Sequence, residues 1–128
     1  MAAPTAATPF NTDLPNYKNM PKLLIGQTAL VTGANSGIGE AVTIAMARAG
    51  ADVVVNYVVG ETDKVIKAIE AEGRKGLAIK ADVSNEAEVD AMFKQAIGHF
   101  GTLDIMVANA GLQRDSALVN MTMAQWIR

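Results

Sequence analysis

The sequence predicts an α/β fold in which four parallel strands form one sheet with helices on both faces. Short apolar runs alternate along the chain with segments of helical periodicity, which is the pattern of strand–helix–strand units. The apolar runs are almost continuous, as strands covered on both faces require. The composition agrees, because 128 residues that are 50% hydrophobic and 19% charged suffice for one domain with a core.

Charge and residue types exclude several classes of function. The formal net charge is −2, so the chain offers no basic field for a nucleic acid. It has no cysteine and a single histidine, so neither a thiolate metal site nor a histidine cluster is expected. No apolar run approaches the roughly 20 residues of a membrane span, and no secretory signal pattern begins the chain. We therefore expect a cytoplasmic protein without metal, membrane or nucleic-acid partners.

The first segment differs in composition from the remainder. Its prolines are Pro4, Pro9, Pro15 and Pro21. Because proline interrupts both helices and sheet ladders, we expect residues 1–24 to form a flexible arm before a domain at 25–128. An alternative is that Phe10, Leu14 and Tyr17 pack on a neighbouring subunit.

Four apolar runs are predicted to be strands. They cover residues 28–32, 52–56, 77–81 and 103–108. The first two are short and rich in β-branched residues, whereas the third alternates more weakly.

A helix is predicted between the first two strands, because apolar residues recur there at spacings of three and four. This predicted sheet-facing stripe consists of Ile38, Ala41, Val42, Ala45, Met46 and Ala49. Gly50 is expected to end the helix.

Two further helices are predicted. The helix at 61–72 has a narrow apolar side and ends at Gly73, so we expect it to lie nearer solvent. The last has Ser84 as its expected N-cap and an apolar stripe formed by Val89, Met92, Phe93, Ala96, Ile97 and Phe100. His99 adjoins this stripe at the end of the helix and is assigned no role.

The most informative segment is the glycine-rich turn at residues 32–39, which reads T-G-A-N-S-G-I-G between a strand and a helix. Gly33 allows a sharp turn, Gly37 lets a ligand approach the backbone, and Gly39 lets the helix pack closely. The unpaired N–H groups of the first helical turn favour an anion. The turn therefore predicts a site for the pyrophosphate of a dinucleotide.

The adenosine ribose of a dinucleotide commonly meets an acidic residue at the end of the second strand. Asp52 has the expected spacing but opens that strand, at the end opposite the ligand. Asn56 and Tyr57 stand at the carboxyl end instead. A neutral residue does not repel a 2′-phosphate, and no Lys or Arg is adjacent to attract one. NAD and NADP both remain possible, with a slight preference for NADP.

At these residues the sequence resembles the short-chain dehydrogenase/reductase family, whose first turn carries T-G-x-x-x-G-x-G. Two later motifs agree in order and spacing: Asp82-Val83 after the third strand, and Asn109-Ala110-Gly111 after the fourth. The family motif is N-N-A-G, and its first Asn is Ala108 here. The resemblance implies a Rossmann-type doubly wound sheet, incomplete, with four strands in the order 3-2-1-4.

The resemblance also implies a cofactor site. The phosphates and the adenosine ribose would be enclosed by Gly33, Asn35, Ser36, Gly37, Ile38 and Gly39. Asn56 and Tyr57 would meet the edge of the ribose. Asp82 and Val83 would hold adenine, and the nicotinamide side would be lined by Asn109, Ala110 and Gly111.

Within the family, P-K-L-L-I-G-Q-T-A-L-V-T-G-A-N-S-G-I-G and G-A-D-V-V-V-N-Y look most like the glucose and ribitol dehydrogenase branch. This similarity implies oxidation of a sugar or polyol alcohol, and the complete enzyme would be a homo-oligomer, expected to be a tetramer. One alternative is a reductase of 3-oxoacyl chains on a carrier protein. Another is a non-catalytic product that binds a dinucleotide, or that pairs with a full-length subunit and regulates it.

The residues that perform family chemistry are a Ser and a Tyr followed four positions later by Lys. Tyr17 and Tyr57 are followed at that spacing by Pro21 and Glu61, so no catalytic residue is assigned. Thr122 opens a capping box with only six residues after it, which predicts the start of a longer helix. We therefore expect a chain truncated before the catalytic half and inactive alone. Its fourth strand would be an apolar edge, which predicts poor solubility.

Overall fold

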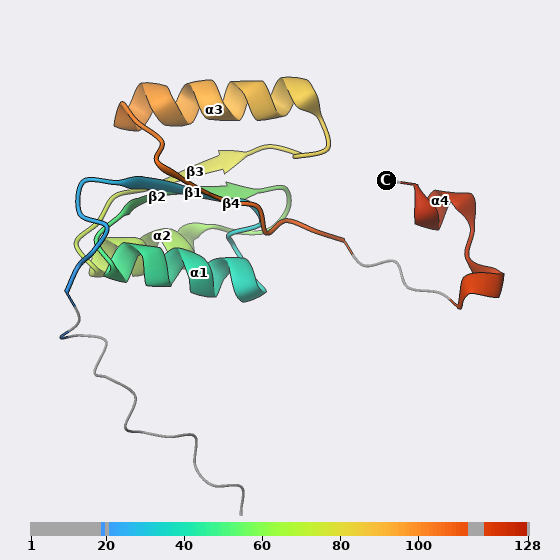
Figure 1. Ribbon diagram of the computed structural model, residues 1–128, viewed down its shortest axis with the longest axis horizontal. Helices are drawn as coiled ribbons and strands as arrows, with labels where there is room; N and C mark the ends of the chain where they lie inside the picture. Colours follow the sequence, from blue (N-terminus) through green and yellow to red (C-terminus); the bar gives the residue numbers. More distant parts are fainter. Residues whose placement is uncertain (1–18, 20, 113–116, 128) are drawn as a thin grey trace, which may run out of the picture.

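The computed structural model describes residues 19, 21–112 and 117–127 (Figure 1). In chain order the main elements are β1 (Thr28–Val31), α1 (Gly37–Arg48), β2 (Asp52–Tyr57), α2 (Asp63–Ala71), β3 (Gly76–Lys80), α3 (Glu86–Phe100) and β4 (Ile105–Val107). The segment 117–127 contains a 3-10 helix, η2 (Leu118–Asn120), and α4 (Met123–Trp126).

The four strands form one sheet in the order β3-β2-β1-β4, and every neighbouring pair is parallel. In the register, Thr28 lies opposite Asp52 and Ala29 lies opposite Ile105. The predicted fold class and strand order are confirmed. All four carboxyl ends meet at one edge of the sheet, which is where ligands bind in open α/β folds.

The sheet is the middle of three layers, with α1 and α2 on one face and α3 on the other (Figure 1). The core toward α1 and α2 contains Val31, Ala34, Ala47, Val53, Val55, Val65 and Ile69. The core toward α3 contains Leu30, Val54, Ile79, Ala81, Met92 and Ala96. Successive side chains of a strand point to opposite faces of the sheet. Because helices cover both faces here, a strand must be apolar at successive positions.

The last strand, β4, is shorter than the predicted 103–108, and Asp104 just before it makes hydrogen bonds to Thr28. Its carboxylate accepts a hydrogen bond from the N–H of Thr28 at 2.8 Å, and its own N–H donates to the Thr28 carbonyl at 2.9 Å. These bonds join the start of β1 to the residue before β4. The other strand limits differ from the predictions by one residue.

The predicted sheet-facing stripe of α1 is partly wrong. Val42 and Met46 do pack against the core, but Ile38 is 76% exposed. Ala41 and Ala45 are also exposed, and the buried residues are Gly39, Thr43 and Ala47. The helix packs through its smallest residues because it approaches the glycine-rich turn very closely. Periodicity alone does not show which side of α1 faces the sheet, because the buried side and the predicted apolar stripe lie next to each other on the helix.

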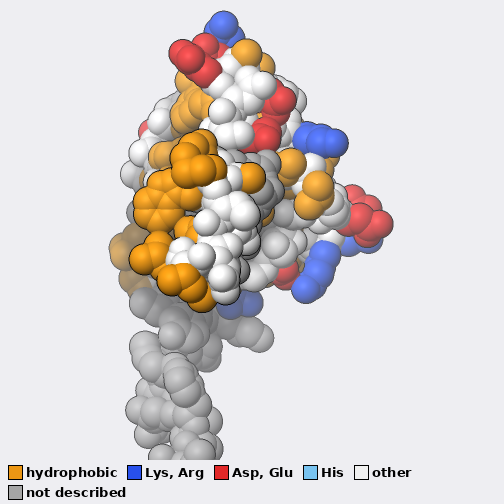
Figure 2. Space-filling model, turned by 90° about the vertical axis from the view of Figure 1, so that its right-hand side faces the viewer, with side chains coloured by type: hydrophobic (Ala, Val, Ile, Leu, Met, Phe, Trp, Pro, Cys, Tyr) orange, Lys and Arg blue, Asp and Glu red, His pale blue; other side chains and the backbone are white. Residues whose placement is uncertain are grey.

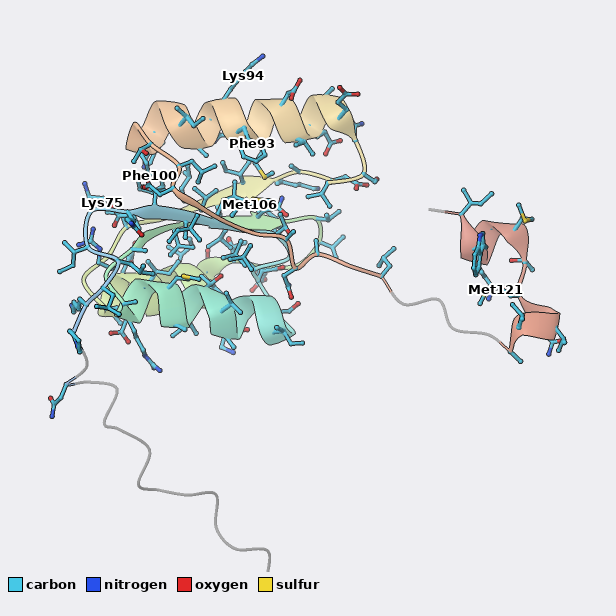
Figure 3. All side chains as sticks on the ribbon, in the orientation of Figure 1. Lys75, Phe93, Lys94, Phe100, Met106 and Met121 are labelled. Carbon is cyan, nitrogen blue, oxygen red and sulfur yellow. The ribbon has the colours of Figure 1, made fainter. Side chains whose placement is uncertain are left out.

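The other two helices confirm most of their predicted apolar sides. Val65 and Ile69 of α2 are buried, and Met92 and Ala96 of α3 are buried. Figure 3 shows Phe93 and Phe100 on the side of α3 that faces the sheet, with Lys94 pointing away.

The predicted N-cap of α3 is wrong by one residue. Asn85 is the N-cap, and its side chain accepts a hydrogen bond from the N–H of Glu88 at 3.2 Å. Ser84 instead donates to Asp82 through both its N–H and its hydroxyl. The capping box at Thr122 is present as predicted.

Most of the predicted arm, including Phe10, Leu14 and Tyr17, lies outside the described residues. At its end, the N–H of Leu24 donates to the carbonyl of Ala49 at 2.8 Å, which attaches this point to the end of α1. Among the helices in the described ranges, none has the length and apolar character needed to cross a membrane.

Candidate cofactor-binding site

The glycine-rich turn connects β1 to α1 and depends on two glycines with positive φ. Gly33 has φ +61° and Gly37 has φ +55°, a region that favours glycine. A Cβ built on Gly37 would meet no described atom within 4 Å outside its own turn and helix, so this backbone faces open space. A Cβ on Gly39 would lie 2.1 Å from the carbonyl oxygen of Gly33. As predicted, Gly33 forms the turn, Gly37 leaves the backbone open, and Gly39 allows the helix to pack closely.

The start of α1 presents unpaired N–H groups. Ser36 is the N-cap in an extended conformation, and its side chain makes no capping hydrogen bond. The first hydrogen bond of the helix runs from the N–H of Glu40 to the carbonyl of Ser36 at 3.2 Å. No described residue accepts from the N–H of Gly37, Ile38 or Gly39. These three donors and the positive end of the helix dipole can hold an anion.

Thr32 and Asn109 connect the turn after β1 to the turn after β4. The buried Thr32 hydroxyl accepts hydrogen bonds from the N–H groups of Asn109 and Ala110, both at 2.9 Å. In return, the Asn109 amide donates to the carbonyls of Thr32 and Gly33 at 3.1 and 3.4 Å. These bonds fix the two turns against each other. The Asn109 side chain thus contacts the backbone of the glycine-rich turn and does not line the cleft.

Asn56 has a structural position at the end of β2. Its side chain is 1% exposed and donates to the carbonyls of Ile79 and Ala81 at 3.4 and 2.9 Å. Its side-chain oxygen accepts from the N–H of Gly33 at 3.3 Å. All three bonds stay within the protein, so Asn56 joins the ends of β1, β2 and β3. A direct contact with a ribose, as expected from the sequence, would require this buried side chain to become accessible.

The turn after β3 places Asp82 and Val83 at the same edge of the sheet. The Asp82 carboxylate accepts from the N–H and the hydroxyl of Ser84 at 2.9 and 2.7 Å. The N–H of Asp82 donates to the Glu88 carboxylate at 2.5 Å, so α3 holds the turn in place. Val83 is 40% exposed beside it.

These turns enclose an open cleft of about 560 Å³ at the carboxyl ends of the strands. It is lined by Gly33, Asn35, Ser36, Val58, Val59, Asp82, Val83, Ser84, Ala110, Gly111 and Leu112. Figure 2 looks onto this end of the molecule, where Lys and Arg side chains stand at the margins. No lysine or arginine lines the cleft within the described part of the chain.

The structure brings together the first, third and fourth turns, as the motifs predicted. Of the predicted site residues, the cleft lining omits Gly37, Ile38, Gly39, Asn56, Tyr57 and Asn109. Four further residues line the cleft and were not predicted as site residues: Val58, Val59, Ser84 and Leu112. The only signal in the sequence was position, because Ser84 and Leu112 directly follow predicted motifs and Val58 and Val59 come after Asn56 and Tyr57.

Comparison with known proteins decides the family. The family model described as short chain dehydrogenase matches residues 27–128. The chain belongs to the short-chain dehydrogenase family. Its members use NAD or NADP as the cofactor, and the free N–H groups and open backbone of the turn fit the diphosphate of such a molecule.

The relatives are reductases and dehydrogenases. The chain is 43% identical over 105 residues to a 3-oxoacyl-[acyl-carrier-protein] reductase of Synechocystis sp., covering 80% of this chain and 42% of the relative. It is 48% identical over 101 residues to versicolorin reductase 1 of Dothistroma septosporum, covering 77% and 38%.

A solved structure agrees with the fold. A crystal structure described as a short-chain alcohol dehydrogenase of Sinorhizobium meliloti 1021 matches with a TM-score of 0.78 and 35% identity, covering 82% of this chain and 42% of that one. The chain thus spans about two fifths of the length of the relatives it matches.

Proposed function

We propose that this chain binds a nicotinamide dinucleotide in the cleft and supplies the cofactor-binding part of a short-chain oxidoreductase. The observation that supports this most strongly is the start of α1. There, the N–H groups of Gly37, Ile38 and Gly39 have no described acceptor, next to a turn whose backbone is open at Gly37. A diphosphate supplies the oxygens that these donors lack.

The remaining parts of the dinucleotide are assigned by the positions of the three turns. Adenine lies against Asp82 and Val83, beyond the β3 turn. Nicotinamide lies toward Ala110 and Gly111, beyond β4. The bound cofactor would give or accept a hydride, and this chain holds and orients it. We assign no acid or base among the residues present, and we expect no turnover from this chain alone.

The relatives favour carbonyl reduction over oxidation of a sugar. Both curated relatives described above are named as reductases, and one is named for 3-oxoacyl chains on a carrier protein. Those names support the 3-oxoacyl reductase alternative better than the glucose and ribitol dehydrogenase interpretation. We therefore propose a reductase of this type as the activity of the complete enzyme.

The choice between NAD and NADP stays a proposal, and its basis changes. The preference for NADP rested on a neutral Asn56 facing the ribose, but this side chain is buried and bonded within the protein. We propose that Asn35, Val58 and Val59, which line the cleft, meet the ribose instead. We propose that both cofactors bind.

A titration of the purified chain with NADH and NADPH tests this function, with nicotinamide fluorescence as the signal. Ser36→Asp places a carboxylate at the N-cap of α1, where Asp is as good a cap as Ser. A charge about 5 Å from a phosphate at an effective dielectric constant of about 20 costs about 3 kcal/mol. We therefore expect about 100-fold weaker binding with unchanged thermal stability.

The matched control is Thr122→Asp. Thr122 is the N-cap of α4 and accepts from the N–H of Gln125, so the charge and the type of position are the same. We expect this variant to bind as the unmodified chain does. Equal binding by Ser36→Asp, or no binding of either dinucleotide by the unmodified chain, would contradict the proposed function.

A further inference from the structure

The side chain of Asn35 connects the glycine-rich turn to the loop after β2. Its Nδ2 donates to the carbonyl of Val59 at 2.8 Å and to the carbonyl of Glu61 at 3.4 Å. These partners lie 24 and 26 residues further along the chain. Residues 58–61, which we term the 58–61 loop, are therefore folded back toward the turn.

The 58–61 loop is built for this approach. Gly60 has φ +88°, a conformation that other residues rarely adopt. A Cβ on Gly60 would lie 3.1 Å from Asn35 Nδ2, which is tighter than most side-chain contacts. Both the backbone of the loop and the absence of a side chain at Gly60 thus serve the two hydrogen bonds of Asn35.

The loop forms one wall of the cleft. Val58 and Val59 line it, and they are 40% and 80% exposed. In the described structure, the side-chain bonds of Asn35 reach this wall itself. Two further bonds join the turn to Asn56, one from the N–H of Ala34 to its carbonyl at 2.9 Å and one from the N–H of Gly33 to its side chain at 3.3 Å. Both bonds to Asn56 end within β2, so the position of Val59 depends on Asn35.

The orientation of the Asn35 amide follows from its partners. Both are carbonyl oxygens, which accept only, so the NH₂ group must face the loop and the oxygen must face elsewhere. Both donors of the amide are then used to hold the wall. The side chain has a structural task at the edge of the cleft, beyond any contact it makes with a ligand.

We propose that Asn35 is a positioning residue that holds the 58–61 loop as the apolar wall for the adenosine half of the dinucleotide. The inference rests on the proposed function, since it concerns how that cofactor is held. Without the two hydrogen bonds, the loop leaves the turn, and Val58 and Val59 no longer cover the adenosine. The nicotinamide half, beyond β4, does not depend on this wall.

The test perturbs the contact from both sides, with Asn35→Ala and Gly60→Ala. We measure amide hydrogen exchange at residues 59–61 and the affinities for NADH, ADP and nicotinamide mononucleotide. Faster exchange in both variants is expected, with about tenfold weaker binding of NADH and of ADP, which corresponds to about 1.4 kcal/mol. Binding of nicotinamide mononucleotide should not change, whereas a general loss of structure would weaken all three ligands.

Arg48→Ala is the control. Arg48 also makes an exposed side-chain bond across 24 residues, from its Nε to the carboxylate of Glu72 at 2.9 Å, but at the other end of α1. We expect unchanged exchange at 59–61 and unchanged affinities. Unchanged exchange in Asn35→Ala, or a loss of NADH affinity without a loss of ADP affinity, would overturn the inference. If the unmodified chain binds none of the three ligands, the proposed function fails, while the exchange data still test the hydrogen bonds.

Discussion

Removing one hydroxyl group at each of two buried threonines gives a sharp test of the packing described above. Thr32 is 3% exposed, and its hydroxyl accepts from the N–H groups of Asn109 and Ala110 at 2.9 Å each. Thr43 is 0% exposed, and its hydroxyl makes no hydrogen bond with any described group. Thr→Val is the same chemical change at both positions.

The two substitutions should differ in their effect on the free energy of unfolding. Thr32→Val leaves two N–H groups without their acceptor, at about 1–3 kcal/mol each when buried. Asn109 keeps a second acceptor, the carbonyl of Val107 at 3.1 Å, so we expect a loss of about 2–3 kcal/mol in total. Thr43→Val removes a buried hydroxyl that has no partner, so stability should be unchanged or rise by about 1 kcal/mol.

Urea unfolding monitored by circular dichroism measures both changes, and Thr32→Ser is the control that retains the hydroxyl. The melting temperature of Thr32→Val should fall by about 10 °C, given a few degrees per kcal/mol for a chain of this size. Equal losses for the two Val variants would refute the reasoning, because the hydrogen bonds of Thr32 would then contribute nothing beyond packing.

Three further substitutions probe other parts of the account. Gly39→Ala places a Cβ 2.1 Å from the Gly33 carbonyl oxygen, so we expect a loss of about 3 kcal/mol in urea unfolding and more than tenfold weaker NADH binding; normal binding would contradict the close helix contact. Asp52→Asn removes the ion pair with Arg74 at 2.8 Å, so stability should fall by about 1 kcal/mol while NADH affinity stays unchanged, since Asp52 opens β2 at the end away from the cleft. Met106→Lys adds a charge to the edge strand β4, where Met106 is 47% exposed (Figure 3). This charge should reduce concentration-dependent association, measured by sedimentation velocity. Equal association by the variant and the unmodified chain would argue against the β4 edge as the cause of association.

The sequence was sufficient to predict the sheet and the turns. The strand order came from the family resemblance. The apolar runs predicted strands covered on both faces, and the glycine spacing located the start of α1. These features depend on local chemistry that is visible in a few consecutive residues. The position of Asp52 at the wrong end of its strand was also predictable, because it follows from chain direction alone.

The roles of individual polar residues were harder to predict. Asn56 was expected to face a ribose, but alternation along β2 and the carbonyls of β3 place its amide inside the protein. Asn35 was expected to face phosphates and ribose, and its bonds to the 58–61 loop depend on a contact between segments 24 residues apart. The rotation of α1 about its axis also depends on tertiary contact, since Ile38 extends an apolar pattern that the sheet does not use. Such features are fixed by the assembled sheet and not by local sequence.

The central claim is that the first N–H groups of α1 bind the diphosphate of a nicotinamide dinucleotide. Amide chemical shifts of the ¹⁵N-labelled chain, recorded during titration with NADH and NADPH, test it at the atoms concerned. We predict saturable shifts at Gly37, Ile38 and Gly39, together with slower hydrogen exchange there. Saturating dinucleotide that leaves these three amides unmoved, or that shifts only residues remote from both the start of α1 and the cleft, would contradict this claim.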